Sequence, residues 1–413
     1  MGLQKSNDTK RQTVRQETDM RKPQEISFTS PKLLRSLVVG LTSLIVLTAC
    51  SATAADATQP TAKRYSSCEK LMRDFPQGVA RSKPSATKSA RAGAVKPEVS
   101  AAVYRANSRL LDKNRDGVIC ESTRTAKSFA PGISSTQLLE WVKAVTGEMS
   151  QPPRNFMGLI WPVGRPLDDQ PDPDVFDGAP FSEHADVMSP KQVRAVTDYF
   201  SSWQSGQQDC TASERREFSE GARTVARWIK GAADVATAPG PCRSSRSAIL
   251  AWTAEQDRDT ARRIFFHESY HAMQNYLLDR CAPILKRNED SMNDLRWFSE
   301  GTAEYFGEYM SAKQDGRTDH VQQILQRASD DLRGDPGISL DSNAYVQAAA
   351  MVLMMEKGMI SERRLADGSY FHDCDWINDF DPSRPEIATI FDDFDKIENS
   401  GGRYFYSDQA ISG

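Results

Sequence analysis

Histidine is scarce in this chain, since its 413 residues include only five. Two of the five, His267 and His271, stand four residues apart around Glu268 in the stretch FFHESYHAMQ. At this composition, chance produces such an HExxH spacing in on the order of a few per thousand chains. The low histidine count therefore makes the stretch the most informative feature of the sequence.

The N-terminal part lacks an apolar run long enough for a membrane span, which takes about 20 residues. Its run Leu37–Ala49 has 13 apolar or small residues and follows basic residues that end at Arg35, as in a signal peptide. The run closes in LTAC, which resembles a bacterial lipobox and implies lipidation of Cys50. The alternative is an ordinary signal peptide with a chance cysteine. Met20 is a second candidate start, because it gives a compact basic leader.

The chain also lacks an excess of positive charge. Its net charge is −4, and residues 1–50 hold eight Lys/Arg against four Asp/Glu, so the remainder is more acidic still. An acidic body argues against nucleic acid as a partner. The length favours two or three domains, and 39% hydrophobic with 26% charged residues is ordinary for a soluble protein.

Cysteine is used sparingly, with seven in the chain. If Cys50 carries lipid, six remain, and an even number in an exported protein suits three disulfides. Six cysteines allow 15 pairings, so the sequence leaves the pairing open. Pairing by domain is the simplest choice, and it gives Cys68–Cys120, Cys210–Cys242 and Cys281–Cys374.

Composition and hydrophobic spacing divide the chain into six segments, and the sequence contains no internal repeat. They are a signal peptide (1–50), a tether (51–63), a compact unit (64–122), a linker (123–135), a mainly helical domain (136–375) and an acidic tail (376–413). Helices are expected near 190–205, 212–231, 253–280, 291–312, 318–332 and 341–358, and a short strand at MGLIWPVG. The expected helix caps are Ser189, Thr211, Thr253 and Asp341. This pattern predicts an α+β protein that is predominantly helical.

The compact unit ends in LDKNRDGVICE, where Asp112, Asn114 and Asp116 alternate before Gly117. Alternating short oxygen side chains can bind a hard cation such as Ca²⁺, while glycine permits the sharp turn. An EF-hand would place its bidentate glutamate where Thr123 stands, so the stretch is not an EF-hand. The other interpretation is a polar turn that ends a helix.

This stretch resembles the Excalibur domain, an extracellular calcium-binding module of bacterial surface proteins that ends in DxDxDGxxCE. The chain supplies DKNRDGVICE and, upstream, a cysteine in the aromatic context YSSC, over residues 64–122. The resemblance implies a Cys68–Cys120 disulfide in a small calcium-binding domain. It also implies that asparagine in place of the more common aspartate weakens binding. The implied calcium ligands are the side chains of Asp112, Asn114, Asp116 and Glu121 and the carbonyl of Val118.

The HExxH stretch predicts a zinc site. Residues i and i+4 share a helix face, so His267 and His271 can bind one metal ion while Glu268 takes a proton from a water molecule on it. A catalytic zinc takes three protein ligands and keeps one open position. HExxHxxGxxH would mark a metzincin, but Gln274 and Leu277 occupy those positions, which excludes that class. The alternative is a pair of histidines on a half-buried helix.

The block WFSEGTAEYFGEY, Trp297–Tyr309, resembles the W-x-x-E-G-x-A-E-[YF] element of gluzincin peptidases, with the bacterial collagenases nearest. The resemblance implies that Glu300, 29 residues after His271, is the third zinc ligand. It implies that Glu304 orients a ligand histidine. Tyr345, in DSNAYVQAAAMVLMM, is the candidate for stabilising the oxyanion of the reaction.

The resemblance covers residues 255–358 and implies a zincin-like peptidase fold. His320 and His372 are alternative donors to the transition state, and His184 receives no role. The chain shows none of the recruitment modules of collagenases, so collagen as a substrate does not follow.

Three functions are therefore open. The first is a surface-anchored zinc metalloendopeptidase that acts on a protein or peptide substrate, with Ca²⁺ in the small domain and a lipid anchor in the cell membrane. The second is a non-catalytic, calcium-dependent lipoprotein that binds the cell surface or cell wall through a zincin scaffold. The third, a hydrolase of amide bonds in the cell wall, fits less well, because zinc amidases usually use other ligand patterns.

Overall fold

The structure is a computed structural model that describes residues 62–412, except 76, 92–95, 113–114, 168–181, 208–209, 239–244, 279–280, 282–283 and 285–294. The signal segment with Cys50 and most of the expected tether lie outside these residues, as do Asn114 and Cys242. Within this range the architecture is mixed α and β, and helices predominate. None of the helices in the described ranges is long and apolar enough to cross a membrane.

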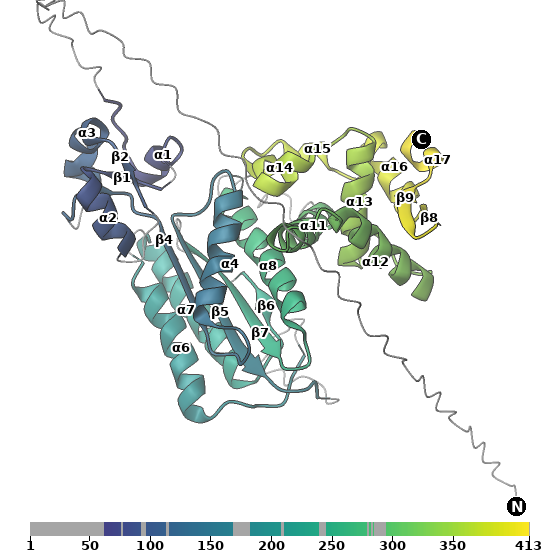
Figure 1. Cartoon of the computed structure of the whole chain (residues 1–413), viewed down its shortest axis with the longest axis horizontal. Helices are drawn as coiled ribbons and strands as arrows, with labels where there is room; N and C mark the ends of the chain where they lie inside the picture. Colours follow the sequence, from purple (N-terminus) through teal and green to yellow (C-terminus); the bar gives the residue numbers. More distant parts are fainter. Residues whose placement is uncertain are drawn as a thin grey trace, which may run out of the picture. The chain divides into compact units, whose positions relative to one another are not determined.

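Nine strands and a larger number of helices make up the described part of the chain (Figure 1). The strands are β1 (Val79–Ala80), β2 (Glu98–Val99), β3 (Val118–Ile119), β4 (Thr123–Ser128), β5 (Asn155–Val163), β6 (Ala236–Thr237), β7 (Ser245–Thr253), β8 (Ile397–Ser400) and β9 (Arg403–Tyr406). The helices up to and including the one with the HExxH stretch are α1 (Cys68–Met72), α2 (Lys83–Arg91), α3 (Ala101–Leu111), α4 (Ser135–Glu148), α6 (Pro190–Ser205), α7 (Ala212–Lys230) and α8 (Arg258–Leu278). The remaining helices are α11 (Arg296–Gln314), α12 (His320–Gly334), α13 (Ala344–Glu356), α14 (Glu362–Asp367), η1 (Ser369–Phe371), α15 (Trp376–Asp379), α16 (Pro385–Asp393) and α17 (Asp408–Ser412).

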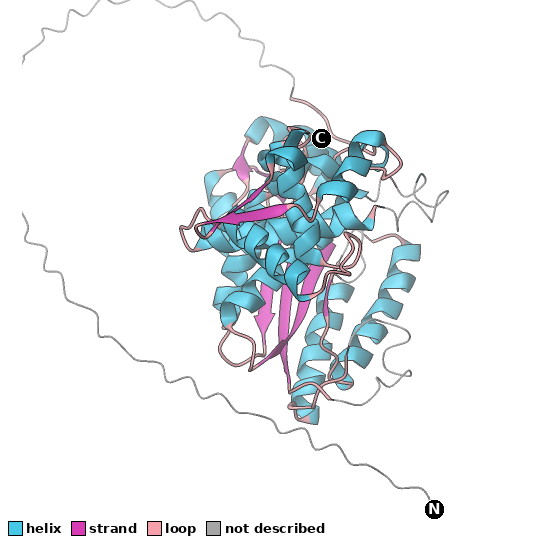
Figure 2. Cartoon of the chain, turned by 90° about the vertical axis from the view of Figure 1, so that its right-hand side faces the viewer, coloured by secondary structure: helices cyan, strands magenta, loops and turns pink. Residues whose placement is uncertain are grey.

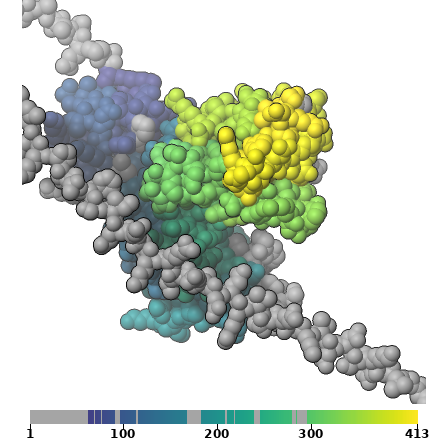
Figure 3. Space-filling view, turned by 45° about the vertical axis from the view of Figure 1, so that its right-hand side comes forward, coloured from purple at the N-terminus to yellow at the C-terminus, as the bar shows by residue number. Residues whose placement is uncertain are grey.

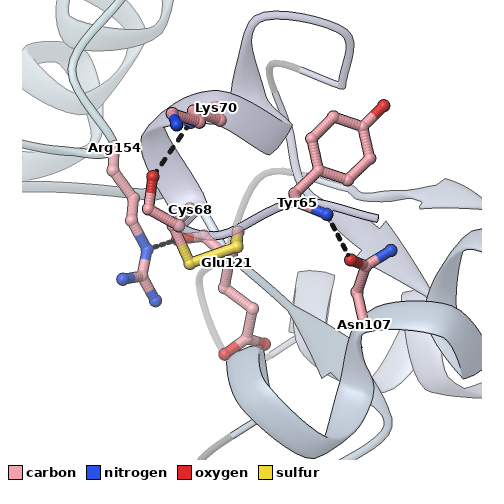
Figure 4. Close-up of a disulfide and its surroundings, with 8 residues drawn as sticks. Tyr65, Cys68, Lys70, Asn107, Glu121 and Arg154 are labelled. Carbon is pink, nitrogen blue, oxygen red and sulfur yellow. Dashed lines mark hydrogen bonds between the residues drawn. A yellow bond between two sulfur atoms is a disulfide. The ribbon is translucent and has the colours of Figure 1, made fainter. Parts of the chain in front are cut away.

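The small unit before residue 123 forms a sheet of order β2-β1-β3, in which β1 is parallel to β2 and antiparallel to β3. A disulfide joins Cys68 at the start of α1 to Cys120 after β3, as expected from the sequence (Figure 4). The backbone N–H of Tyr65 donates to the Asn107 side chain on α3, which secures the start of the unit. Its core is small, so the disulfide is expected to supply much of its stability.

The main sheet has the order β4-β5-β7-β6. Strands β4, β5 and β7 are parallel, and β6 pairs with β7 in the antiparallel direction at one edge. Helices α4 and α8 cover one face, while α6 and α7 cover the other (Figures 1 and 2). Because both faces are covered, β5 and β7 are buried almost throughout. Phe156 and Ile160 of β5 point to the α4/α8 face, and Met157 points to the other.

Two segments assigned to irregular structure from the sequence are folded. Residues 123–135, expected as a linker, contain the edge strand β4, whose polar sequence TRTAKS hides its role in the sheet. Residues 376–412, expected as an acidic tail, contribute Trp376, Ile387 and Tyr406 to the main core. Figure 3 shows these yellow residues lying directly against the green helices. The acidic residues conceal the tail's apolar positions, which are spaced for short helices.

The expected helices agree with the observed ones to within a few residues at most ends. Ser189 and Thr211 cap α6 and α7, each with a complete capping box. Thr253 instead ends β7, and the Asp257 side chain accepts hydrogen bonds from the first backbone N–H groups of α8. Helix α13 is likewise capped by Asn343 and not by Asp341.

Disulfides hold the helical part together as well. Cys281, just after α8, is bonded to Cys374, 93 residues further along, so the expected pairing is confirmed. Cys210 is also disulfide-bonded, while its expected partner Cys242 lies outside the described residues. Disulfides of this kind indicate an oxidising environment.

Helix α11 packs between α8 and α13, and two glycines allow this close approach. A Cβ atom on Gly301 would lie 2.7 Å from the carbonyl oxygen of Gln347 on α13. A Cβ atom on Gly307 would lie 3.0 Å from the carbonyl oxygen of Arg263 on α8. The close contact with α8 brings the side chains of α11 against the HExxH turn.

Candidate metal centre

Helices α8 and α11 bring the three predicted zinc ligands together. The Nε2 atoms of His267 and His271 lie 3.0 Å apart. A carboxylate oxygen of Glu300, Oε2, lies 3.1 Å from Nε2 of His271 and 3.4 Å from Nε2 of His267. One ligand atom from each residue falls within 4.8 Å of the others, and this is the single such His/Cys/Asp/Glu group in the described ranges.

The donor set fits zinc. Two imidazole nitrogens and one carboxylate oxygen are the ligands of a common class of catalytic zinc sites. The side chains of His267, His271 and Glu300 are 11%, 17% and 28% exposed, so solvent reaches the group. Such partial exposure suits a site that must keep one coordination position open to water or substrate.

His267 is held by a carboxylate on its far side. Its Nδ1 atom lies 2.8 Å from Oε2 of Glu304, which is 3% exposed. The other Glu304 oxygen pairs with Arg263, one helical turn before His267. Because Glu304 accepts the Nδ1 hydrogen, Nε2 of His267 is left facing the ligand group. Glu304 therefore lies beside His267, one of the two histidines predicted to bind zinc.

Sequence reasoning missed two residues of the site, Arg263, which pairs with Glu304, and Gln274, which contacts His271. The Oε1 atom of Gln274 lies 2.8 Å from Nδ1 of His271. Arg263 precedes the HExxH stretch by four residues and Gln274 follows His271 by three, so helical spacing alone puts both on the metal-binding face. That spacing was the available signal for them.

Burial and hydrogen bonding between the histidines and the glutamates shift the pKa values of the site's titratable groups. Burial alone would lower the pKa of His267, but its hydrogen bonds to Glu300 and Glu304 outweigh burial and raise the pKa to about 10. Burial would raise the pKa of Glu300 and of Glu304, but the hydrogen bonds of the histidines lower both. For Glu268, burial prevails and raises the pKa above the ordinary value, although the two histidines oppose it.

Glu268 differs from its acidic neighbours because no other described side chain pairs with its carboxylate. It follows His267 on α8 and is half-buried. Among the described residues it has no hydrogen-bond or ion-pair partner. Glu300 and Glu304 are both engaged with histidine. Of the acids on these two helices that border the ligand group, Glu268 is thus the one free to exchange a proton.

Tyr345 lies against Arg263, the residue that pairs with Glu304. Its ring is stacked between two guanidinium groups, with Arg263 at 5.1 Å and Arg327 at 5.3 Å from the ring centroid. Its hydroxyl accepts a hydrogen bond from Arg327 at 3.4 Å. The structure therefore places Tyr345 in a charged cluster that supports Glu304, and the contacts it makes within the described residues do not include the three ligands.

The alternative donors His320 and His372 are engaged elsewhere. Nε2 of His320 lies 3.1 Å from the Tyr305 hydroxyl and 2.9 Å from a Glu362 oxygen. Nε2 of His372 lies 2.8 Å from the Ser150 hydroxyl, which itself donates to a backbone carbonyl. The structure does not bring either imidazole to the ligand group.

His184, which has no partner apparent from the sequence, is buried and has two. Its Nδ1 atom lies 2.8 Å from the carbonyl oxygen of Gly164, and its Nε2 atom lies 3.5 Å from a carboxylate oxygen of Asp234. These contacts join the loop before α6 to the loop after α7, so they explain His184 as a structural residue.

The described residues of the expected calcium loop include one buried side-chain oxygen, on Asp112, that has no hydrogen-bond partner among them. Asp112 ends α3 and is 8% exposed. Its Oδ2 atom accepts hydrogen bonds from the Tyr104 hydroxyl and from the backbone N–H of Gly117, while its Oδ1 atom has none. A buried carboxylate oxygen without a donor is costly, and a cation would satisfy it.

Two of the other expected calcium ligands, Asp116 and Glu121, accept hydrogen bonds from within the chain. Asp116 Oδ1 accepts from the backbone N–H of Val118 at 2.9 Å, and Glu121 Oε1 accepts from the Ser89 hydroxyl at 2.5 Å. In the described part of the loop, Asp112, Asp116 and Glu121 do not form a group of the kind seen at His267. The backbone carbonyl of Glu121 accepts from Arg154 instead, at 2.7 Å (Figure 4).

Comparison with known proteins does not assign the chain to a family. No family model matches the chain, and neither a curated protein nor a solved structure matches it significantly. The side chains of the site are therefore the basis for proposing a function.

Proposed function

We propose that this protein is a zinc-dependent metallopeptidase of the gluzincin type. The observation that carries the proposal is the convergence of His267, His271 and Glu300 beside the uncommitted carboxylate of Glu268. Three zinc donors with a free acid next to the first of them are the minimal equipment for metal-assisted hydrolysis.

The proposed reaction assigns one task to each residue. His267, His271 and Glu300 hold the ion, which when bound lowers the pKa of a water molecule and polarises a carbonyl group. Glu268 accepts the proton of the attacking water as its oxygen bonds to the peptide carbonyl carbon. Glu268 then returns that proton to the amine nitrogen as the C–N bond breaks. The attacking water thus gives its oxygen and one hydrogen to the new carboxylic acid and its other hydrogen to the new amine, so atoms and charge balance.

The fold supports this assignment in a second way. Strand β7 leads through a short turn into α8, so the sheet holds the helix that carries two ligands and the base. Helix α11 then supplies both the third ligand and the acid that orients His267. A zincin-like arrangement of a sheet with an HExxH helix packed on it is therefore our proposal for the fold of this domain.

We propose a peptide or protein as the substrate and the cell surface as the place of action. The disulfides and the lipobox-like LTAC segment favour an exported protein anchored through Cys50, with access to cell-wall material. The small domain is proposed as an Excalibur-like calcium module, since Asp112 presents a buried oxygen that lacks a donor.

That same oxygen favours a second candidate function. A calcium-dependent binding lipoprotein would use the small domain for attachment and the helical domain as a scaffold without turnover. It predicts calcium-dependent binding to cell-wall material and no hydrolysis. The presence of Glu268 and all three ligand residues makes this candidate the weaker one.

The test uses residues 51–413 produced under oxidising conditions. Zinc content and cleavage of casein, gelatin and muropeptides are measured for the wild type, for Glu268→Gln and for the matched control Glu255→Gln, whose side chain is exposed outside the site. We expect about one zinc in all three proteins. We also expect cleavage of the protein substrates by the wild type and the control only.

Other outcomes have clear meanings. Bound zinc without cleavage in any of the three proteins would favour the binding lipoprotein. Cleavage of muropeptides and not of casein or gelatin would indicate that the substrate is cell-wall peptide. A wild-type protein that binds no zinc would overturn the proposed function.

A further inference from the structure

The two histidines of the metal centre are oriented by chemically different partners. Nδ1 of His267 faces the carboxylate of Glu304, whereas Nδ1 of His271 faces the side-chain amide of Gln274 at 2.8 Å. Gln274 is 1% exposed and lies on the metal-binding face of α8. A glutamine so deeply buried must have its amide group satisfied by the protein.

The amide of Gln274 is satisfied at both ends by α11. Its Nε2 atom donates to the carbonyl oxygen of Ser299 at 3.0 Å and to the hydroxyl of Thr302 at 2.8 Å. Its Oε1 atom accepts from the Ser299 hydroxyl at 3.1 Å. Rotating the amide by 180° would set Oε1 against the Ser299 carbonyl oxygen, which cannot donate. The network therefore determines which amide atom faces His271.

That orientation determines what Nδ1 of His271 must carry. An amide oxygen can only accept, so Nδ1 must hold a hydrogen. Nε2, on the other side of the ring, then faces Glu300 and His267, where the ion would bind. We propose that Gln274 is a positioning residue that fixes His271 with Nε2 toward the metal. This inference rests on the proposed zinc site.

Charge explains why an amide is suited to this position. The carboxylates of Glu268, Glu300 and Glu304 already surround the two histidines. A further ionised carboxylate at a position that is 1% exposed would lose its hydration and meet three like charges. Gln274 supplies the acceptor that His271 needs without adding negative charge.

The first test measures zinc affinity by competition with a chelator. Gln274→Met removes the acceptor at nearly constant length, and we expect a loss of about 10- to 100-fold in zinc affinity. Gln274→Glu keeps a side-chain oxygen that can accept from Nδ1 of His271, so its zinc affinity should stay much closer to that of the wild type. Thr302→Val is the matched control, since it removes a partner of Gln274 and leaves the bond to His271 intact.

The second test needs neither zinc nor activity. Nitrogen NMR of histidine-labelled, metal-free protein distinguishes the two imidazole tautomers, and five histidines keep the spectrum simple. The signal of His271 is assigned by its loss in His271→Gln. We expect Nδ1 of His271 to carry a hydrogen in the wild type and in Thr302→Val, and to carry it in only part of the molecules in Gln274→Met.

Opposite results overturn the proposal. It fails if Nδ1 of wild-type His271 carries no hydrogen, or if Gln274→Met and Thr302→Val bind zinc equally well. The wild-type spectrum tests the proposal even where Gln274→Met does not fold. If the wild type binds no zinc, the proposed function fails, and the hydrogen on Nδ1 of His271 still decides the role of Gln274.

Discussion

His267 and Glu304 join the two helices of the metal centre, with Nδ1 of the imidazole 2.8 Å from Oε2 of the carboxylate. Glu304 does not stand alone, since Arg263 pairs with its other oxygen and approaches Glu308 to 3.4 Å. Arg263 lies one turn before His267 on the same helix, so α8 contributes both the ligand and the cation that holds the ligand's acceptor in place. The guanidinium keeps Glu304 ionised in a buried setting, where a lone carboxylate would be costly.

Arg263→Met should therefore weaken zinc binding even though Arg263 is not a ligand. Without its cation, Glu304 becomes a buried charge with one unpaired oxygen, and it holds His267 less firmly. We expect zinc affinity to fall by about 10- to 100-fold, measured by competition with a chelator. Arg262→Met is the control, because Arg262 pairs with Asp315 away from the ligands. Equal losses in the two variants would contradict this role for Arg263.

The His267, His271 and Glu300 cluster was predictable because its residues follow local rules. His267 and His271 share a face by helical spacing, and Glu300 is identified by the EGxAE motif. Their orienting groups were harder to predict, because Arg263 and Gln274 act through contacts with α11, 25 or more residues away in sequence. The catalytic role of Tyr345 was predicted only from its position in the chain after the EGxAE motif. Its contacts with Arg263 and Arg327 depend on packing that no short motif encodes.

The fold was predictable where hydrophobic spacing is regular. The helix 190–205 is an example, since Ser189 and a proline mark its start. Strand β4 was missed because an edge strand next to solvent can be polar and leave no apolar alternation. The segment 376–412 was missed because its buried side chains belong to short elements and are separated by acidic residues.

Gly301→Ala should destabilise the protein through the contact of α11 with α13. The added Cβ atom would lie 2.7 Å from the carbonyl oxygen of Gln347, and that oxygen is backbone and cannot turn aside. Overpacking of this kind typically costs about 1–3 kcal/mol in the free energy of unfolding. Gly221→Ala, in the middle of α7 with no atom within 4 Å, is the control and should stabilise by roughly 0.5–1 kcal/mol. Denaturant unfolding measures the change in the free energy of unfolding for both variants. No change for Gly301→Ala would show that α11 and α13 can move apart without cost.

Asp257→Ala should destabilise α8 in a pH-dependent way. Hydrogen bonds from the backbone and side chain of Thr260 lower the pKa of Asp257 below its ordinary value. A carboxylate with a lowered pKa stabilises the folded state above the ordinary pKa of about 3.9 and loses that effect as the pH falls through its folded pKa. Loss of the cap should cost about 1 kcal/mol at pH 7.

Urea unfolding of the wild type and of Asp257→Ala, from pH 7 to pH 3, tests this. The difference in unfolding free energy between them should be constant down to about pH 5 and should shrink below about pH 4. Glu255→Ala, in the same turn, is the control and should show no such difference. A difference that does not depend on pH would mean that Asp257 acts through packing and not through its charge.

Removal of residues 376–413 should abolish both folding and zinc binding, whereas removal of everything before residue 122 should abolish neither. The C-terminal segment packs behind the ligand helix: the ring of Phe380 stacks on Phe298 with centroids 3.8 Å apart, and Phe391 meets Trp297 at 5.3 Å. Both partners stand within three residues of Glu300 on α11.

The free energy contributed by the buried side chains of residues 376–413 is the reason why their removal should abolish folding. A large apolar side chain contributes about 1.5–3 kcal/mol when fully buried, and the segment buries Trp376, Ile387, Ile390 and Tyr406. Their sum is comparable with the 5–15 kcal/mol that separates folded from unfolded domains. The N-terminal truncation keeps β4, which begins at Thr123, so the main sheet stays complete. Circular dichroism and zinc content of the two truncated proteins measure the contrast. A folded, zinc-binding protein that ends at residue 375 would show that α11 is held in place by α8 and α13 alone.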